Sequence, residues 1–313
     1  MRLAVLLVLC LIVFSGCGIH PQPEAGMQDS PLPLFQFGLL ADVQYADKNT
    51  VGARRYRDAL DYLETCIDSF LEEDLKFVVH CGDIIDGRKT VAESNQDLDR
   101  VLHQFSRLRV PVRHVIGNHC LEVPRDQLMS RLQLPVGYYS FLHENWRFIV
   151  VDSMELGICG VPAEDPRHQQ ATAWLASHPI AEFPHAQTWN GGLGKEQRKW
   201  LQNELQRAEQ NEESVVIFSH HPVAEAASTK HHLLWDYQEV LQILDSSPAF
   251  TAWINGHDHS GGYAVRNGRT HLTVPGMVES APESPAFTTV EVYSNFLRVG
   301  NLGDGPITLI AKQ

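Results

Sequence analysis

The sequence predicts one α/β domain made of two packed β-sheets with helices on the outside. Short apolar runs rich in β-branched residues alternate with amphipathic segments through most of the chain, and hairpin signals follow near its end. Neither a repeat nor a clean linker separates these two regions. The chain has 313 residues, 43% of them hydrophobic and 20% charged, which is the composition of an ordinary globular domain.

The N-terminal segment is predicted to be an export signal. Arg2 precedes an apolar stretch from Leu3 to Phe14, which is shorter than the about 20 residues that span a bilayer and suits a signal peptide. The following Ser15-Gly16-Cys17 resembles a bacterial lipobox, although Phe14 stands where leucine is usual. We therefore expect residues 1–17 to direct export. Cys17 would anchor a lipoprotein to the membrane facing the periplasm or exterior, with an ordinary cleaved signal or an uncleaved anchor as alternatives.

The segment that follows the leader, residues 18–33, is rich in proline and lacks an apolar period, which is typical of a flexible tether. The folded domain is expected over residues 34–313. Its predicted strands and helices alternate. The strands are 35–40, 77–81, 112–116, 147–151 and 215–218, and the helices are 54–71, 95–108 and 195–208.

The C-terminal part of the chain is predicted to form two hairpins. Strands at 262–265 and 270–274 flank Asn267-Gly268, a strong turn signal, and strands at 288–293 and 296–299 form a second pair. We expect these strands to form a second, more antiparallel sheet.

The net charge of -13 limits the partners. A protein that binds a nucleic-acid polymer needs a basic surface, so we expect none here. Divalent cations can hold a small phosphorylated ligand even in an acidic protein, because the ion is usually the largest local charge in its site.

Polar residues follow the ends of several predicted strands. They are Asp42, Asp83, Asn118, His220 and His257. Loops at the carboxyl ends of strands are where open α/β sheets place their sites, so we expect these side chains to meet. The mixture of oxygen and nitrogen donors without a thiolate cluster suits Mn²⁺, Fe²⁺ or Zn²⁺. Taken singly, each of these residues is commonly a turn or cap residue.

The order of the segments resembles the calcineurin-like metallophosphoesterase superfamily. The segments are Asp42-Val43-Gln44, Gly82-Asp83 with Asp86, Gly117-Asn118-His119, Ser219-His220-His221 and Gly256-His257-Asp258-His259. The resemblance implies a four-layer sandwich of two mixed β-sheets flanked by helices. It also implies two metal ions bridged by Asp83. Asp42, Gln44, Asp83 and His259 would bind one ion, and Asp83, Asn118, His220 and His257 the other, while His119 and Asp86 would be catalytic.

Gln44 stands where the superfamily usually has histidine. Together with the matching segments 54–57, 190–197 and 256–263, it resembles the manganese-dependent ADP-ribose/CDP-alcohol diphosphatases. That resemblance implies a manganese-dependent phosphohydrolase that cleaves the phosphoanhydride of a small nucleotide-diphosphate substrate. The alternatives are a phosphomonoesterase or cyclic-nucleotide phosphodiesterase of the same superfamily, and a lipoprotein that only binds its ligand.

Three arginines and four cysteines each have two possible roles. Arg54, Arg55 and Arg57 would suit phosphate recognition, or they would lie on a solvated helix face. Cys66, Cys81, Cys120 and Cys159 would form disulfides after export or remain free thiols; Cys81 lies in an apolar run, which favours a buried thiol. Cys120 stands where an acidic residue usually follows Gly-Asn-His, so support for His119 is expected from Asp86.

Overall fold

The computed structural model describes residues 32–303 and 305–312, which belong to one compact unit. The predicted leader and nearly all of the tether lie outside the described residues. None of the helices in the described ranges is long and apolar enough to cross a membrane.

The first sheet has six strands in the order β12-β11-β10-β1-β2-β3. Its strands are β1 (Phe35–Leu40), β2 (Leu75–His80), β3 (Val112–His114), β10 (Phe287–Val292), β11 (Phe296–Val299) and β12 (Thr308–Ala311). β1, β2 and β3 are parallel, whereas β10 to β12 join in antiparallel fashion. The carboxyl ends of the three parallel strands therefore meet at one edge.

The second sheet also has six strands, in the order β4-β5-β6-β7-β9-β8. They are β4 (Tyr139–His143), β5 (Trp146–Val150), β6 (Ser214–Phe218), β7 (Phe250–Asn255), β8 (Gly262–Arg266) and β9 (Arg269–Thr273). Here β5, β6, β7 and β9 are parallel and the two outer strands are antiparallel. β5, β6 and β7 are buried at every position, as expected for strands covered on both faces.

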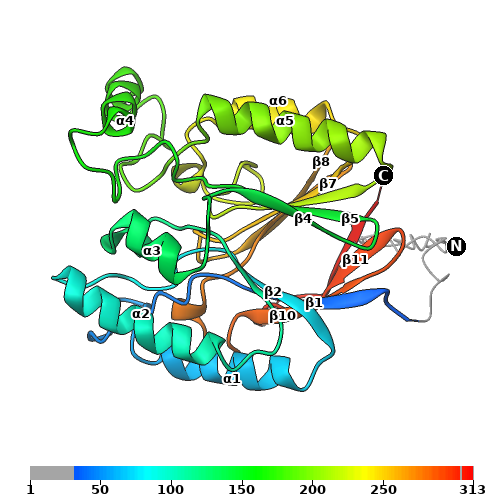
Figure 1. Ribbon diagram of the computed structural model, residues 1–313, viewed down its shortest axis with the longest axis horizontal. Coiled ribbons are helices and arrows are strands. Elements are labelled where there is room, and N and C mark those ends of the chain that lie inside the picture. Colours follow the sequence, from blue (N-terminus) through cyan, green and yellow to red (C-terminus); the bar gives the residue numbers. More distant parts are fainter. Residues whose placement is uncertain (1–31, 304, 313) are drawn as a thin grey trace, which may run out of the picture. The chain divides into compact units, whose positions relative to one another are not determined.

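The two sheets pack face to face (Figure 1), and aromatic side chains fill the space between them. Phe37 of β1 stacks on Phe77 of β2 with ring centroids 4.9 Å apart, and it meets Phe148 of β5 edge-on at 5.7 Å. Phe148 in turn stacks on Phe218 of β6. These rings join the sheets because apolar side chains from alternating positions point into the space between them.

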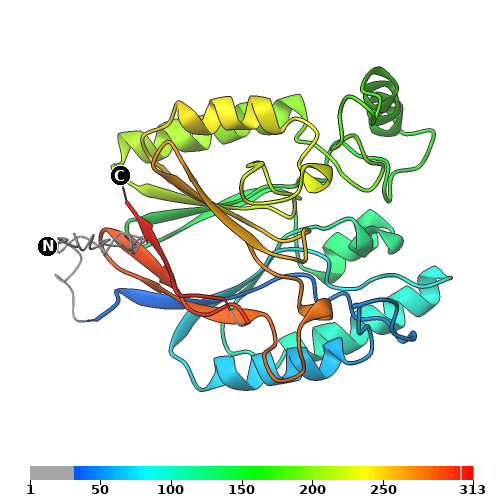
Figure 2. The same ribbon diagram turned by 180° about the vertical axis from the view of Figure 1, so that it is seen from behind.

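Helices cover the outer face of each sheet (Figures 1 and 2). α1 (Ala59–Leu71), α2 (Val91–Phe105) and α3 (Arg125–Arg131) pack on the first sheet, and α5 (Lys195–Gln210) and α6 (Tyr237–Asp245) pack on the second. α4 (Pro166–Ser177) lies to one side of this stack. The order helices, sheet, sheet, helices confirms the predicted four-layer sandwich.

The expectation that the C-terminal strands form a sheet of their own is wrong. β9 pairs in parallel with β7, so the first hairpin extends the second sheet. β10 pairs with β1, which places the remaining strands in the first sheet. Because Val290 and Val292 of β10 are buried in the intersheet core, this pairing both hides apolar surface and covers an exposed strand edge.

Two predicted helices also begin elsewhere. The helix predicted from residue 54 begins at Ala59, so Arg54, Arg55 and Arg57 lie in the preceding loop. α2 begins at Val91 because Thr90 and Glu93 form a capping box. The strands β4, β7 and β12 and the helices α3, α4 and α6 are absent from the predicted ranges. All four cysteines in the described chain are free thiols, three of them buried.

Candidate metal centre

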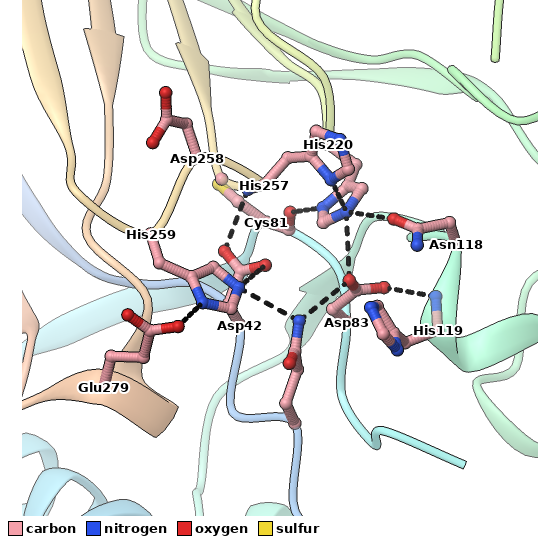
Figure 3. Close-up of polar contacts among 12 residues, drawn as sticks. Asp42, Cys81, Asp83, Asn118, His119, His220, His257, Asp258, His259 and Glu279 are labelled. Atoms are coloured by element: carbon pink, nitrogen blue, oxygen red, sulfur yellow. Dashed lines mark hydrogen bonds and ion pairs between the residues drawn. The ribbon is translucent and has the colours of Figure 1, made fainter. Parts of the chain in front are cut away.

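The structure brings the seven predicted metal donors together at one end of the intersheet seam (Figure 3). The loops after β1, β2 and β3 carry Asp42, Gln44, Asp83 and Asn118, and the loops after β6 and β7 carry His220, His257 and His259. All seven side chains are buried or nearly so.

His220 is the centre of one half of the cluster. Its Nε2 lies 3.2 Å from Asp83 Oδ2, 3.1 Å from Asn118 Oδ1 and 3.1 Å from His257 Nδ1. Asp83, His220 and His257 form a buried group whose donor atoms could hold one ion. A cation between two imidazole nitrogens and a carboxylate would account for this convergence.

Gln44 is the centre of the other half. Its Nε2 lies 3.2 Å from Asp83 Oδ2 and 3.0 Å from His259 Nε2, and His259 Nε2 lies 3.5 Å from Asp42 Oδ1. Gln44 Oε1 and Asp42 Oδ1 are buried without a hydrogen-bond partner. Because the amide oxygen and nitrogen are nearly equal in shape, rotating the Gln44 amide would aim Oε1 at the same point. Buried oxygens without partners are costly, and a bound cation would satisfy them.

The backbone is unusual at the same residues. Eight non-glycine residues of the described chain have positive φ, and four are candidate ligands: Asp42, Gln44, Asp83 and His257, with φ between 40° and 72°. L-residues adopt this region at a cost, and such strain collects at functional sites. A Cβ on Gly117 would lie 2.2 Å from Asp83 Oδ1, and one on Gly256 would lie 2.4 Å from Asp42 Oδ2, so glycine is required before these ligand segments.

Each carboxylate is fixed by the neighbouring segment. The backbone N–H of His257 donates to Asp42 Oδ2 at 3.0 Å, and the backbone N–H of His119 donates to Asp83 Oδ1 at 2.9 Å. One oxygen of each carboxylate is thereby held by the backbone, and the second oxygen points into the cluster (Figure 3). The donors are positioned in advance rather than free to rotate.

The electrostatics favour positive charge in the cluster. Burial alone would lower the pKa of His220 and of His259, but Asp83 beside His220, and Asp42 with Glu279 beside His259, raise each pKa to about 9. Burial alone would raise the pKa of Asp83, yet His220 and His119 hold it below its usual range. The Asp83 carboxylate thus stays ionised and draws positive charge, which divalent cations would supply. The residues present therefore fit two such ions.

The ring nitrogens that face away from the cluster have partners that sequence reasoning missed. His220 Nδ1 lies 2.9 Å from the carbonyl oxygen of Cys81, and His259 Nδ1 lies 2.8 Å from Glu279 Oε1. Metal-binding histidines ordinarily donate their second N–H to such acceptors. Glu279 ends a short 3-10 turn (Met277–Glu279) after β9, and no local motif marks it.

His119 lies beside the cluster but does not belong to it. Its Nδ1 is 3.1 Å from Asp86 Oδ1, and Asp86 also forms an ion pair with Lys48, a residue that the sequence did not single out. Burial lowers the pKa of His119. Cys120 takes no part in this support, because its Sγ accepts a hydrogen bond from the backbone N–H of Ile84.

A cavity of about 460 Å³ opens over the donors. Beyond the donors, it is lined by Arg54, His119, Glu122, Cys159, Trp189 and His232. His232 reaches this wall from a short 3-10 turn (Lys230–His232). Arg54 is the one of the three predicted arginines that lines the cavity, and it donates to Glu279 at 3.2 Å. Arg55 donates to the carbonyl of Ser280 and Arg57 pairs with Asp47, so these two side chains stabilise loops instead.

Comparison with known proteins agrees with this geometry. The family model described as calcineurin-like phosphoesterase matches residues 35–261. The manganese-dependent ADP-ribose/CDP-alcohol diphosphatase of Homo sapiens is 34% identical over 91% of this chain and 95% of its own length. The protein of the same name from Arabidopsis thaliana is 32% identical over 85% of this chain and 93% of its own length. A solved dimetal phosphatase from Danio rerio superposes with a TM-score of 0.85 at 31% identity and covers 90% of this chain and 100% of its own.

Proposed function

This chain belongs to the calcineurin-like phosphoesterase family and is a metal-dependent hydrolase, and from that premise we propose that it cleaves the phosphoanhydride of nucleoside-diphosphate-linked compounds. The substrate class comprises ADP-ribose and CDP-alcohols, and Mn²⁺ is the favoured ion. The seven-donor cluster beneath an open cavity carries the proposal. Support for an anhydride substrate comes from relatives that are named for this activity and that match most of the chain.

The seven candidate donors would hold two divalent ions, which would supply Lewis acidity and activate a water for in-line attack on phosphorus. The chain's own residues set the geometry. The carboxylate of Asp83 faces candidate donors of both halves of the cluster, so it is the residue that would contact both ions. The strained loops after β1 and β2 hold Asp42 and Asp83 in place before substrate arrives, which removes reorganisation from the reaction.

His119 would act on the departing phosphate. Asp86 faces Nδ1 of the ring with its backbone carbonyl oxygen at 3.4 Å and its carboxylate Oδ1 at 3.1 Å, which leaves Nε2 for the oxygen that separates from phosphorus. Arg54 adds a positive charge to the cavity wall and suits a second phosphate, because the substrate carries two. Neither residue needs to form a covalent intermediate.

A substrate panel tests the proposal. Metal-stripped protein is reloaded with Mn²⁺, Mg²⁺ or Zn²⁺ and given ADP-ribose, CDP-choline, AMP or cyclic AMP, and the products are identified by chromatography. We expect AMP with ribose 5-phosphate from the first substrate, CMP with phosphocholine from the second, and the highest turnover with Mn²⁺. Phosphate release from AMP, or opening of cyclic AMP, with both anhydrides intact would instead support the phosphomonoesterase or phosphodiesterase alternative.

We also propose that the protein is exported and anchored through a lipid on Cys17. Support comes from the short apolar stretch after Arg2 and from the lipobox-like Ser15-Gly16-Cys17. Mass spectrometry of the mature amino terminus from a membrane fraction should find lipid-modified Cys17 as the first residue. An intact Met1 peptide in the cytosol would refute export.

A further inference from the structure

Asn190 is a fully buried amide that touches the metal centre from outside. It lies between α4 and α5, just before Gly191-Gly192, and has no solvent exposure. The adjoining glycines do not face the cavity as a phosphate loop would. Gly192 pairs its backbone with Leu156, and the Gly191 carbonyl accepts from the backbone N–H of Trp235. Asn190 is therefore the part of this segment that reaches a candidate ligand.

The amide nitrogen of Asn190 fixes how the side chain is oriented. Nδ2 donates to the backbone carbonyls of His185 at 2.9 Å, His231 at 2.6 Å and Leu233 at 3.2 Å. Carbonyl oxygens only accept hydrogen bonds, so the atom facing them must be the nitrogen. The oxygen Oδ1 is then directed to the other side.

On that side Oδ1 lies 2.8 Å from His257 Nε2. An amide oxygen can only accept, so Nε2 must carry the proton. A neutral imidazole has one N–H, and Nδ1 of His257 is therefore left with its lone pair. That Nδ1 is the atom that faces His220 Nε2 at 3.1 Å inside the cluster.

We propose that Asn190 is a positioning residue for the metal centre. By accepting a hydrogen bond from His257 Nε2, Asn190 selects the tautomer in which Nδ1 would bind the metal. Through its Nδ2 it also connects this candidate ligand to the backbone carbonyls of His185, His231 and Leu233. His220 and His259 are oriented the other way round. The Cys81 carbonyl and Glu279 contact their Nδ1 atoms, so Nε2 is the atom that would bind the metal. The inference rests on the proposed role of His257 as a ligand.

Mn²⁺ binding to metal-stripped protein tests the inference without relying on turnover. Free Mn²⁺ is followed by electron paramagnetic resonance in wild type, Asn190→Ala, His257→Ala and the control Gln187→Ala. Gln187 is a matched control because it is a buried amide of the same segment that donates to the Pro184 carbonyl and touches no candidate ligand. We expect one of two sites to weaken by about 10- to 100-fold in Asn190→Ala, to disappear in His257→Ala and to be unchanged in Gln187→Ala.

Binding by Asn190→Ala equal to wild type would overturn the positioning role while the metal centre stands. Two intact sites in His257→Ala would instead overturn the ligand assignment on which the inference depends. If Asn190→Ala does not fold, ¹⁵N-histidine spectra of the wild type decide, with the His257 signals identified by their loss in His257→Gln. A proton on Nε2 is expected, and a proton on Nδ1 would contradict the proposal.

Discussion

The two sheets contribute different chemistry to one site. The loops of the first sheet carry the candidate oxygen donors, Asp42, Gln44, Asp83 and Asn118, whereas the loops of the second carry the candidate imidazole donors, His220, His257 and His259. Neither sheet alone carries the mixed donor set that suits Mn²⁺. The site therefore exists only where the sheets are packed, and metal binding should report on that packing.

Removing the carboxylate that faces both halves of the cluster should have the most severe consequence. Asp83→Ala should abolish stable metal loading and lower turnover by more than about 1,000-fold, because it deletes the carboxylate shared by Gln44 and His220. Metal content by mass spectrometry and turnover with excess Mn²⁺ are the measurements. Asp99→Ala, an exposed carboxylate in α2, is the control; a variant that loads two ions as wild type does would contradict the bridging role.

Removing His119 should separate chemistry from metal binding. His119→Ala is expected to lower turnover by about 10²- to 10⁴-fold, the range for loss of a general acid or base, while Mn²⁺ affinity changes only a few-fold. Turnover and Mn²⁺ titration on the same preparation check both statements. A large loss of metal would place His119 among the ligands, and unchanged turnover would remove it from the chemistry.

The seam itself can be weakened away from the donors. Phe148→Ala should lower the free energy of unfolding by about 3–5 kcal/mol, because the ring is fully buried and contacts aromatic rings of both sheets. Urea unfolding measures the change. Leu142→Ala on the neighbouring strand β4 is the control, since that side chain is 52% exposed and should cost only a few tenths of a kcal/mol. Equal losses for the two variants would show that the seam is not the stabilising contact.

A buried histidine of the first sheet should affect stability rather than metal binding. His114 packs beside His80 and Phe105 on the helix side, and burial lowers its pKa to about 4. The unfolded chain binds this proton near pH 6.5, so folded stability should fall as the pH drops from 7 to 5, by roughly 2 kcal/mol for this group. His114→Gln, measured by urea unfolding at both pH values, should flatten the slope; an unchanged slope would mean that His114 is protonated in the folded state.

A smaller effect is expected from the charge behind the half of the cluster that is centred on Gln44. Glu279→Gln keeps a hydrogen-bond acceptor for His259 but removes the carboxylate charge, and should weaken Mn²⁺ binding at one site by about 10-fold with little change in kcat. Glu283→Gln, an exposed glutamate a few residues on, is the control. Equal affinity in the two variants would limit Glu279 to orienting the ring.

Sequence reasoning placed five of the seven candidate donors after strand ends, and the family resemblance added Gln44 and His259. It did not find Asn190 as a partner of His257, or Glu279 as a partner of His259, because those contacts join segments 67 and 20 residues apart. Such contacts are set by packing rather than by local pattern. The wrong sheet assignment of β10 has the same cause. Its own residues predict a strand in a hairpin, but they do not show that this strand pairs with β1.

The division of donors between the sheets is tested most directly by anomalous diffraction from crystals of the Mn²⁺-loaded protein. We predict two peaks separated by the Asp83 carboxylate, one contacted by Asp42, Gln44 and His259 and the other by Asn118, His220 and His257. A single peak, or peaks contacted by residues of one sheet alone, would contradict a centre built jointly by both sheets.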